Sequence, residues 1–468
     1  MVANAKWLTM ENHLQTDGTS TPGIPPAARL VTEVWGPFRT LLAARRNLLE
    51  IIPEAVTRRP IISGRTGGVR WHMVAEPEAL RHILRDRLDI YPKSEVIKNI
   101  LEPAIGQSLF IADGDHWRWQ RRAAAPVFRR RSVDGLAPIM SAAADTACCR
   151  ILAGSGRAEL HGEMVQTTFD VIGGVLLAGE RKLDKEFVHG AIEAFLASAA
   201  RVSVLDIAGL ATWIPRPRQF FRPRSLKVLR RIADDVIADR LKQRDRPDRD
   251  FLDTLLDGMD PESGRRMTPG ELRDNLLAFI VAGHETTALA LAWSFFLCAF
   301  DVQVQKRLRA EAAAVLGGRT AGAEDVPNLP YTRSVIEEAL RLYPPAAILS
   351  RTACAHDQIC GREIRAGDTV ILPIYALHRH RDLWDSPDSF DPGRFSGDTV
   401  IERYAYLPFG DGPRVCIGAS FAMLEAVIVL ATLMSRFRFR RIRGLDPKPV
   451  MVLTLRPSGG VHLAVERI

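Results

Sequence analysis

The segment that most restricts the possible folds of this chain is residues 408 to 418, PFGDGPRVCIG, which contain a single cysteine, Cys416. Its glycines, Gly410, Gly412 and Gly418, allow tight backbone turns and the close approach of a flat ligand. The apolar run that follows, IGASFAMLEAVIVLATLMSRF, predicts a long buried helix that begins at or just after Cys416. Because the N–H groups and the dipole at a helix N-terminus favour a thiolate, Cys416 is a candidate soft metal ligand.

A haem iron is the metal centre that such a cysteine suits best. Zinc and iron–sulfur sites need several protein ligands, and the six cysteines, at positions 148, 149, 298, 354, 360 and 416, lack metal-binding spacing. A haem needs one axial thiolate, and its propionates need cations such as Arg414. The alternative, a small buried apolar side chain, is the common role of a lone cysteine but does not explain the residues around Cys416. The cysteine usage also predicts free thiols in a reducing compartment.

A second segment, LLAFIVAGHETTALALAWSFFLCAF at residues 276 to 300, is apolar enough to resemble a membrane span but contains the polar stretch HETT. The charged residue of that stretch, Glu285, is costly in an apolar helix unless it is functional or paired. Thr268 and Glu271 form a capping box upstream, with a proline between them at the first helical position, so the sequence predicts a soluble helix from 268 to about 300. A buried helix with a satisfied polar kink remains the alternative.

Two further motifs are EEALRLYPP and GDHWRWQRRAAAPVF. In the first, Glu338 and Arg341 are three residues apart and can pair on one helix face, and Arg394 follows later in FDPGRF. In the second, Trp117 and Arg121 are four residues apart and share a helix face. An E-x-x-R pair alone is uninformative, because many surface helices contain one.

Together these motifs resemble the cytochrome P450 family, whose haem-binding pattern F-x-x-G-x-R-x-C-x-G matches residues 409 to 418. The distal-helix pattern (A/G)-G-x-(D/E)-T matches residues 282 to 286, and the motif order is that of the family. The resemblance implies a mainly α fold with small β-sheets (α+β), a triangular helical prism. In it the haem lies between the long distal helix and the helix after the cysteine loop. It also implies one domain over residues 25–468, with 1–24 as a flexible N-terminus.

The resemblance assigns a role to each of several residues. The thiolate ligand of the iron is Cys416, and the cofactor is haem b. The remaining haem contacts are Trp117, Arg121, Arg351, Arg414, Phe409, Gly410, Ala282 and Gly283. The proton-relay pair is Glu285 and Thr286, and the structural network behind the haem is Glu338, Arg341 and Arg394. The candidate substrate pocket consists of Leu109, Phe110, Ala282, Thr286, Ala347, Ile348 and Leu453.

The function implied is a haem-thiolate monooxygenase that inserts one oxygen atom from O2 into a C–H bond. The pocket candidates are apolar apart from Thr286, which favours a lipophilic substrate such as a fatty acid, terpenoid or steroid, with fatty-acid-like chains slightly preferred. The segment from about 165 to 225 is expected to cover the pocket as a mobile lid. Two alternatives are a peroxide-driven peroxygenase and a non-catalytic haem-thiolate sensor; the acid–alcohol pair Glu285–Thr286 argues against both.

The net charge of +8 points to an acidic partner. The basic residues are not gathered into a tail or stripe and no zinc knuckle is present, which argues against nucleic acid. No G-x-G-x-x-G fingerprint for flavin or nicotinamide is present, so we expect a separate electron donor, a ferredoxin or flavodoxin with its reductase. The basic cluster, defined as Arg118, Arg122, Arg129, Arg130 and Arg131, is the expected docking face, with a merely solvated face as the alternative. The first 30 residues have no long apolar stretch, so we expect no membrane span and a cytoplasmic protein.

Overall fold

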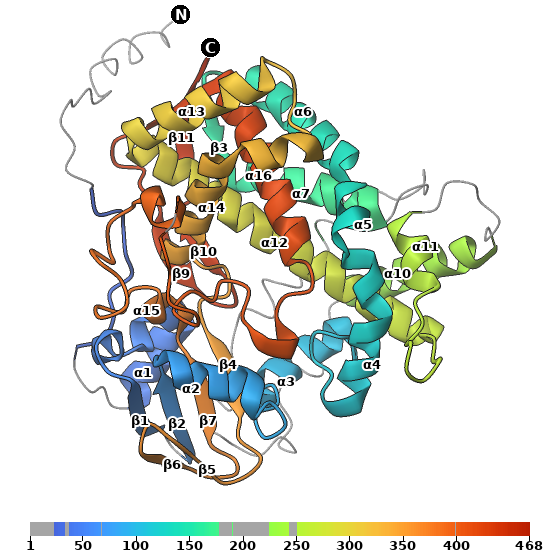
Figure 1. Cartoon of the computed structure of the whole chain (residues 1–468), viewed down its shortest axis with the longest axis vertical. Coiled ribbons are helices and arrows are strands. Elements are labelled where there is room, and N and C mark those ends of the chain that lie inside the picture. The colour runs from blue at the N-terminus through green and yellow to red at the C-terminus, as the bar shows by residue number, and fades with distance from the viewer. Residues whose placement is uncertain are drawn as a thin grey trace, which may run out of the picture.

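The computed structural model describes residues 23–32, 37–66, 68–176, 190, 224–242, 250–397 and 399–468 (Figure 1). These residues form a mainly helical body with small sheets, as the sequence predicts. The helices are α1 (Pro37–Arg46), α2 (Pro77–Arg81), α3 (Glu95–Ile105), α4 (Gly114–Ala124), α5 (Arg130–Asp134), α6 (Ala137–Ala153), α7 (Leu160–Leu176), α10 (Arg224–Lys242), α11 (Phe251–Leu256), α12 (Pro269–Phe300), α13 (Val302–Leu316), α14 (Pro330–Leu342), α15 (Ile374–Leu377) and α16 (Ala419–Arg436).

The long helix α12 runs through the middle of the molecule, and α16 crosses close to it (Figure 1). Helix α12 begins with the predicted capping box. The Thr268 backbone N–H donates to the Glu271 carboxylate at 2.9 Å, and the Glu271 N–H donates to the Thr268 hydroxyl at 3.3 Å. Helices α7, α10, α14 and α16 pack around it, and every residue from 288 to 299 is buried. The apolar run therefore serves as the centre of the protein core.

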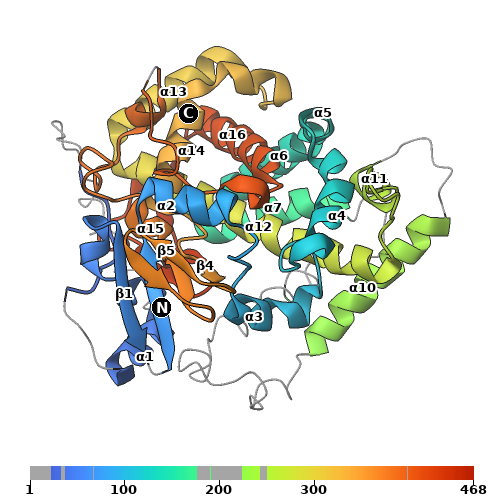
Figure 2. The same ribbon diagram turned by 60° about the horizontal axis from the view of Figure 1, so that its bottom comes forward.

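In the part of the chain that the structure describes, the strands form four small sheets, and the largest has the order β1-β2-β7-β4. The strands are β1 (Ile61–Thr66), β2 (Val69–Val74), β3 (Arg157–Glu159), β4 (Leu349–Thr352), β5 (Asp357–Ile359), β6 (Arg362–Ile364), β7 (Thr369–Leu372), β8 (Phe437–Arg441), β9 (Lys448–Met451), β10 (Leu455–Ser458) and β11 (His462–Arg467). The four-stranded sheet lies on the opposite side of the molecule from α13 and α6, with α1 beside it (Figures 1 and 2).

The C-terminal strands belong to two different sheets. Strand β10 pairs with β9, so the chain turns at residues 452 to 454. Strand β11 instead joins β8 and β3 in a separate sheet. Gly459 and Gly460, with φ angles of 90° and 77°, redirect the chain from one sheet to the other. The glycine pair therefore marks a turn between two sheets.

Within the described ranges, three segments are long and apolar enough to cross a membrane by length and composition: residues 130–153, α12 and α16. In α12 and α16, 72% of the most apolar window is buried inside the protein. Core packing therefore accounts for the apolar surface of these two helices. The expected lid, residues 165 to 225, begins within α7, whose C-terminal half packs against α12; residues 177–189 and 191–223 lie outside the described part of the chain.

Candidate active site

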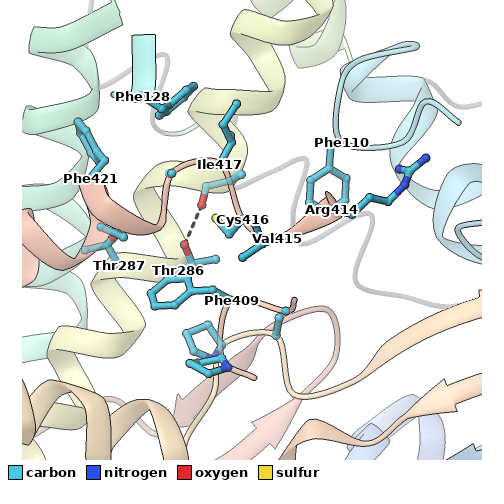
Figure 3. A pocket seen from close by; sticks show the side chains of 18 of the residues that line it. Phe110, Phe128, Thr286, Thr287, Phe409, Arg414, Val415, Cys416, Ile417 and Phe421 are labelled. Atoms are coloured by element: carbon cyan, nitrogen blue, oxygen red, sulfur yellow. Dashed lines mark hydrogen bonds between the residues drawn. The ribbon is translucent and has the colours of Figure 1, made fainter. Parts of the chain in front are cut away.

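Cys416 lies in the loop before α16, three residues ahead of the first helical residue, Ala419. Its backbone N–H donates to the Phe409 carbonyl at 2.9 Å. Gly412 has a φ of 71°, and a Cβ there would collide with the carbonyl oxygen of Leu84, so this turn requires glycine. The loop thus presents Cys416 and the Phe409 ring to a cavity of about 330 Å³ whose opposite wall includes Thr286 (Figure 3).

The electrostatics of Cys416 differ from those expected for a simple helix-capping thiolate. Burial raises the pKa of the Cys416 thiol, while a backbone hydrogen bond from Gly418 and the charges of Arg121 and Lys93 lower it. The sulfur is open to the cavity but enclosed by protein on its other sides, and the cost of burying a charge exceeds these favourable contributions. A bound metal cation would reverse the balance, because a coordinated thiol is deprotonated.

Four cationic side chains line one edge of the cavity: Lys93, Arg121, Arg351 and Arg414. Arg121 Nη1 donates to the Val415 carbonyl at 2.8 Å, which ties α4 to the cysteine loop. Arg414 Nη2 donates to the Ala112 carbonyl at 2.8 Å and to Asp113 at 2.6 Å, and its guanidinium lies 4.4 Å from the Trp117 ring centre. These contacts gather the positive charges where α4 and the cysteine loop meet.

Some donors of this cationic edge are buried and have no acceptor among the residues that the structure describes. They are Nε of Arg351 and Nη1 of Arg414. Burial and the charge of Arg414 lower the pKa of Arg351 to about 10. Burial and the charges of Arg351 and Arg414 lower the pKa of Lys93 to about 7. Unused donors and mutually repelling cations are unfavourable in a buried site, so this edge suits an anionic group.

The opposite wall of the cavity is formed by α12. Ala282, Gly283, Thr286 and Thr287 all line it, and the Thr286 hydroxyl donates to the Ala282 carbonyl at 2.8 Å (Figure 3). Gly283 also allows close helix packing, because a Cβ there would lie only 3.0 Å from a methyl carbon of Ile172 on α7. The smallest residues of the HETT region therefore face the cavity and its largest residues do not.

Glu285 does not line the cavity, although Thr286 beside it does. Its carboxylate accepts a hydrogen bond from Thr454 at 2.8 Å and forms an ion pair with Arg456 of β10. The Glu285 side chain is 3% exposed, whereas that of Arg456 is 35% exposed. The acid of the expected relay pair is thus bound on the far side of α12 and connected to the surface through Arg456.

Glu338, Arg341 and Arg394 form the expected cluster behind the cysteine loop. Arg341 and Glu338 are fully buried and joined by two hydrogen bonds of 2.6 and 2.8 Å, and Arg394 Nε lies 3.5 Å from Glu338. Arg341 also donates to the backbone carbonyls of His378, Pro387 and Ser389. All three carbonyls belong to the irregular segment between α15 and the 3-10 turn of Arg394, so this network fixes that segment.

The amino-acid sequence of the chain is similar to those of proteins of a known family. Residues 42–464 match the sequence model of the cytochrome P450 family. A cyclooctat-9-en-7-ol 5-monooxygenase of Streptomyces melanosporofaciens is 32% identical over 443 residues, which are 92% of this chain and 91% of that protein. The chloroplastic protein LUTEIN DEFICIENT 5 of Arabidopsis thaliana is 31% identical over 84% of this chain and 70% of its own length. The chain belongs to the cytochrome P450 family.

The solved haem domain of cytochrome P450DA has the same fold, with a TM-score of 0.76, 24% identity and 92% coverage of both chains. Because the chain belongs to the cytochrome P450 family, it is a monooxygenase that uses a haem-thiolate cofactor, O2, a substrate and a redox partner. Its residues fit that cofactor, because the cavity is lined by the Cys416 thiol, by many apolar side chains and by a cationic edge with unused donors. Among the described residues, no group of three or more His, Cys, Asp and Glu could hold a metal ion.

All the predicted haem contacts line the cavity of the P450, and so do Leu109, Phe110, Ala282 and Thr286 of the predicted substrate pocket. The structure places Ala347, Ile348 and Leu453 outside the cavity wall. In β4 the cavity is lined by Leu349 and Arg351, because alternate residues of a strand face the same side. Leu453 packs against the core in the bend between β9 and β10.

Sequence reasoning missed several residues of the site. Lys93 follows a proline in an irregular segment and carries no motif, yet its ammonium lies 3.8 Å from the Phe110 ring centre at the cavity edge. His378 accepts a hydrogen bond from the Leu407 N–H at 2.8 Å and so links the Arg341 network to the start of the cysteine loop. Ile172 and Phe251 add walls from α7 and α11, which only the packing of the helices could reveal.

The basic cluster is only partly a free surface. Arg122 forms two hydrogen bonds, of 2.6 and 3.0 Å, with the buried carboxylate of Asp260, and it holds the pKa of that carboxyl well below its usual range. Arg118 is 51% exposed and pairs with Asp115, whereas Arg130 is 84% exposed. Arg129 and Arg131 are also exposed. Arg122 is 31% exposed and shares its charge with Asp260 and Glu262, so it offers less free charge to a partner than Arg130 does, and its role in docking stays a prediction.

Proposed function

We propose that this cytochrome P450, loaded with haem b, inserts one oxygen atom from O2 into a C–H bond of a lipophilic terpenoid or steroid. The observation that carries the proposal is one continuous cavity that joins Cys416, the Thr286 face of α12 and an apolar wall. The second oxygen atom leaves as water, for which an external protein supplies two electrons and the solvent supplies two protons.

When bound, haem supplies the iron at which O2 is activated, and the chain controls what reaches it. Cys416 Sγ would bind the iron, and Arg351, Arg414, Lys93 and Trp117 would hold the propionates. The small residues Ala282 and Gly283 on the α12 wall would leave room for O2 and substrate. The Thr286 hydroxyl donates to a carbonyl of its own helix and can turn to donate into the cavity instead.

Glu285 is the proposed proton carrier between solvent and Thr286. Its carboxylate is held by Thr454 and Arg456, and Arg456 is partly exposed. A proton can therefore reach Glu285 from the Arg456 side and pass toward Thr286 when the carboxylate leaves that ion pair. This relay favours O2 chemistry over a peroxide-driven peroxygenase or a gas sensor, neither of which needs delivered protons.

The substrate class rests on the character of the cavity wall and on the relatives. Ile172, Val175, Phe251, Ala278 and Phe279 make the wall away from the cationic edge apolar. The Streptomyces relative is named for cyclooctat-9-en-7-ol, a cyclic unsaturated alcohol rather than a chain with a carboxylate. We therefore place terpenoids and steroids ahead of the fatty-acid-like chains that the sequence slightly favours.

The first test is the absorption spectrum of the dithionite-reduced protein with and without carbon monoxide, for the wild type and Cys416→Ser. A strongly red-shifted Soret band that disappears in the variant supports Cys416 as the iron ligand. A spectrum typical of histidine ligation that survives the substitution contradicts the proposal.

The second test is a titration of the ferric protein with a cyclic terpenoid alcohol, a steroid and a long-chain fatty acid, followed by the Soret shift that accompanies displacement of water. Turnover with O2 and an external donor is then compared with turnover by hydrogen peroxide, in the wild type and in Thr286→Ala. Tighter binding of the fatty acid overturns the substrate class. Equal product from peroxide in both proteins supports the peroxygenase instead.

A further inference from the structure

Asp113 is a carboxylate at the cationic edge whose role the family motifs do not explain. It immediately precedes α4, in the N-cap position, yet its side chain makes no capping hydrogen bond. An aspartate in this position ordinarily accepts from a backbone N–H of the first helical turn. The Asp113 carboxylate is used elsewhere.

Its two oxygens bind two cations from different parts of the chain. Asp113 Oδ1 accepts from Arg414 Nη2 at 2.6 Å, and Oδ2 lies 2.6 Å from Lys98 Nζ on α3. The backbone N–H of Lys93 also lies 3.5 Å from Oδ1. The Asp113 side chain is 24% exposed and that of Arg414 is 6% exposed, so the pair is largely shielded from water.

Arg414 is held in a defined orientation by these contacts. Its Nη2 is occupied by Asp113 and by the Ala112 carbonyl, and its guanidinium lies over the Trp117 ring. Its Nη1 is buried and has no acceptor among the residues that the structure describes. A planar guanidinium fixed at one nitrogen presents its other nitrogen in a fixed direction.

We propose that Asp113 is a positioning residue and the counter-ion of the cationic edge. It orients Arg414 toward a haem propionate, and its negative charge offsets part of the positive charge that Lys93, Arg351 and Arg414 place beside the haem. Through Lys98 it also fastens α3 to that edge. The inference requires haem at Cys416 but not the substrate class proposed above.

The charge of Asp113 acts on the reduction of the iron. Reduction adds one negative charge at the haem, so a nearby anion opposes it and a nearby cation favours it. Removing the Asp113 charge leaves Arg414 uncompensated and makes reduction easier. Removing the Lys98 charge leaves the Asp113 charge less compensated and makes reduction harder, by a smaller amount because Lys98 is partly exposed to solvent.

The experiment is a spectroelectrochemical titration of the haem-loaded full chain without substrate or redox partner, for the wild type, Asp113→Asn, Asp113→Glu and Lys98→Met. We expect Asp113→Asn to shift the reduction equilibrium toward ferrous iron by about threefold to tenfold at low salt. Lys98→Met should shift it the opposite way by less, and Asp113→Glu should remain close to the wild type. Haem retention is measured alongside by transfer to apomyoglobin, and Asp113→Asn should lose haem faster.

An unchanged potential in Asp113→Asn overturns the proposal, as does a shift of the same sign in Asp113→Asn and Lys98→Met. If Asp113→Asn does not retain haem, the sign of the Lys98→Met shift and the behaviour of Asp113→Glu decide the question. Because the titration involves neither turnover nor substrate, its failure leaves the proposed function standing. Failure of the substrate titration likewise leaves this inference untouched.

Discussion

Arg341 and Arg414 are both buried arginines close to the cysteine loop, but the protein uses their hydrogen-bond donors differently. Arg341 is fully buried, and its Nε, Nη1 and Nη2 all donate to Glu338 or to backbone carbonyls. Arg414 has one nitrogen bound to protein and another, Nη1, without an acceptor among the described residues. We call the Arg341 arrangement the closed network, because each of its donor nitrogens has an acceptor within the protein. We call the Arg414 arrangement the open network, because Nη1 has none among the described residues.

The difference separates residues that hold the fold from residues that hold a ligand. In a closed network the charges are paired within the protein, so removing one of them lowers the free energy of unfolding. An open network has unpaired cations whose cost is offset only when an anion arrives. Exposed arginines such as Arg130 form a third case, since solvent already satisfies them and their loss costs little.

The largest effect is expected in the closed network. Arg341→Met leaves Glu338 buried without its cation and should lower the free energy of unfolding by about 3–5 kcal/mol. Chemical denaturation of the haem-loaded protein measures this. The double variant Glu338→Met with Arg341→Met removes both charges and should recover part of the loss. A double variant no more stable than Arg341→Met would contradict the conclusion that Glu338 and Arg341 compensate each other's charges.

The open network should respond in ligand binding instead. Arg414→Met removes one charge-assisted hydrogen bond to a propionate, about 1.5–3 kcal/mol, and should speed haem loss roughly 10- to 100-fold. Transfer of haem to apomyoglobin gives the rate. Arg118→Met, on the exposed face of α4, is the matched control and should leave the rate unchanged. Equal rates in Arg414→Met and the wild type would remove the distinction between the two networks.

The closed network also predicts a pH dependence through His378. Burial and the charge of Arg341 lower the pKa of His378 to about 3, below its usual value of about 6.5. Between these two values the unfolded chain binds a proton that the folded protein does not, so stability falls as the pH falls, by up to about 1.4 kcal/mol per pH unit. In His378→Gln, urea unfolding from pH 7 to 4 should show a shallower loss. If the free energy of unfolding depends on pH identically in His378→Gln and the wild type, His378 is not the source of this pH dependence.

The smallest effect on stability, below about 0.5 kcal/mol, is expected at the exposed arginines. Arg130→Glu should nevertheless slow reduction by an acidic ferredoxin or flavodoxin severalfold at low salt, with the difference vanishing at high salt. Stopped-flow reduction measures the rate. Arg46→Glu on α1, also strongly exposed, lies at the sheet end of the molecule away from α5 and is the control (Figure 1). Equal slowing in both variants would show a general charge effect rather than a docking face.

Much of the site was predictable because its motifs are local. The cysteine loop follows from glycines whose positive φ angles only glycine adopts easily, as at Gly410 and Gly412. The start of α12 follows from a capping box within four residues. The Trp117–Arg121 pair follows from helical spacing alone. In each case the sequence neighbours that determine the feature are also its neighbours in space.

The residues that sequence reasoning missed or misplaced depend on contacts between distant segments. Arg456 binds Glu285 across 171 positions, and Arg414 binds Asp113 across 301. Such pairs depend on how α12, α4 and the C-terminal strands pack, which no local pattern records. The same holds for Arg122, which binds Asp260 across 138 positions while its side chain stays 31% exposed.

By itself the sequence determined the iron ligand candidate, the central helix and the family, because these rest on short patterns with strict backbone or capping requirements. Only the tertiary structure decided which cations are satisfied and which remain open, and on which side of α12 the acid of the relay lies. The physical reason is that the cost of a buried charge is set by the groups around it in space. Those groups come together only when the helices pack.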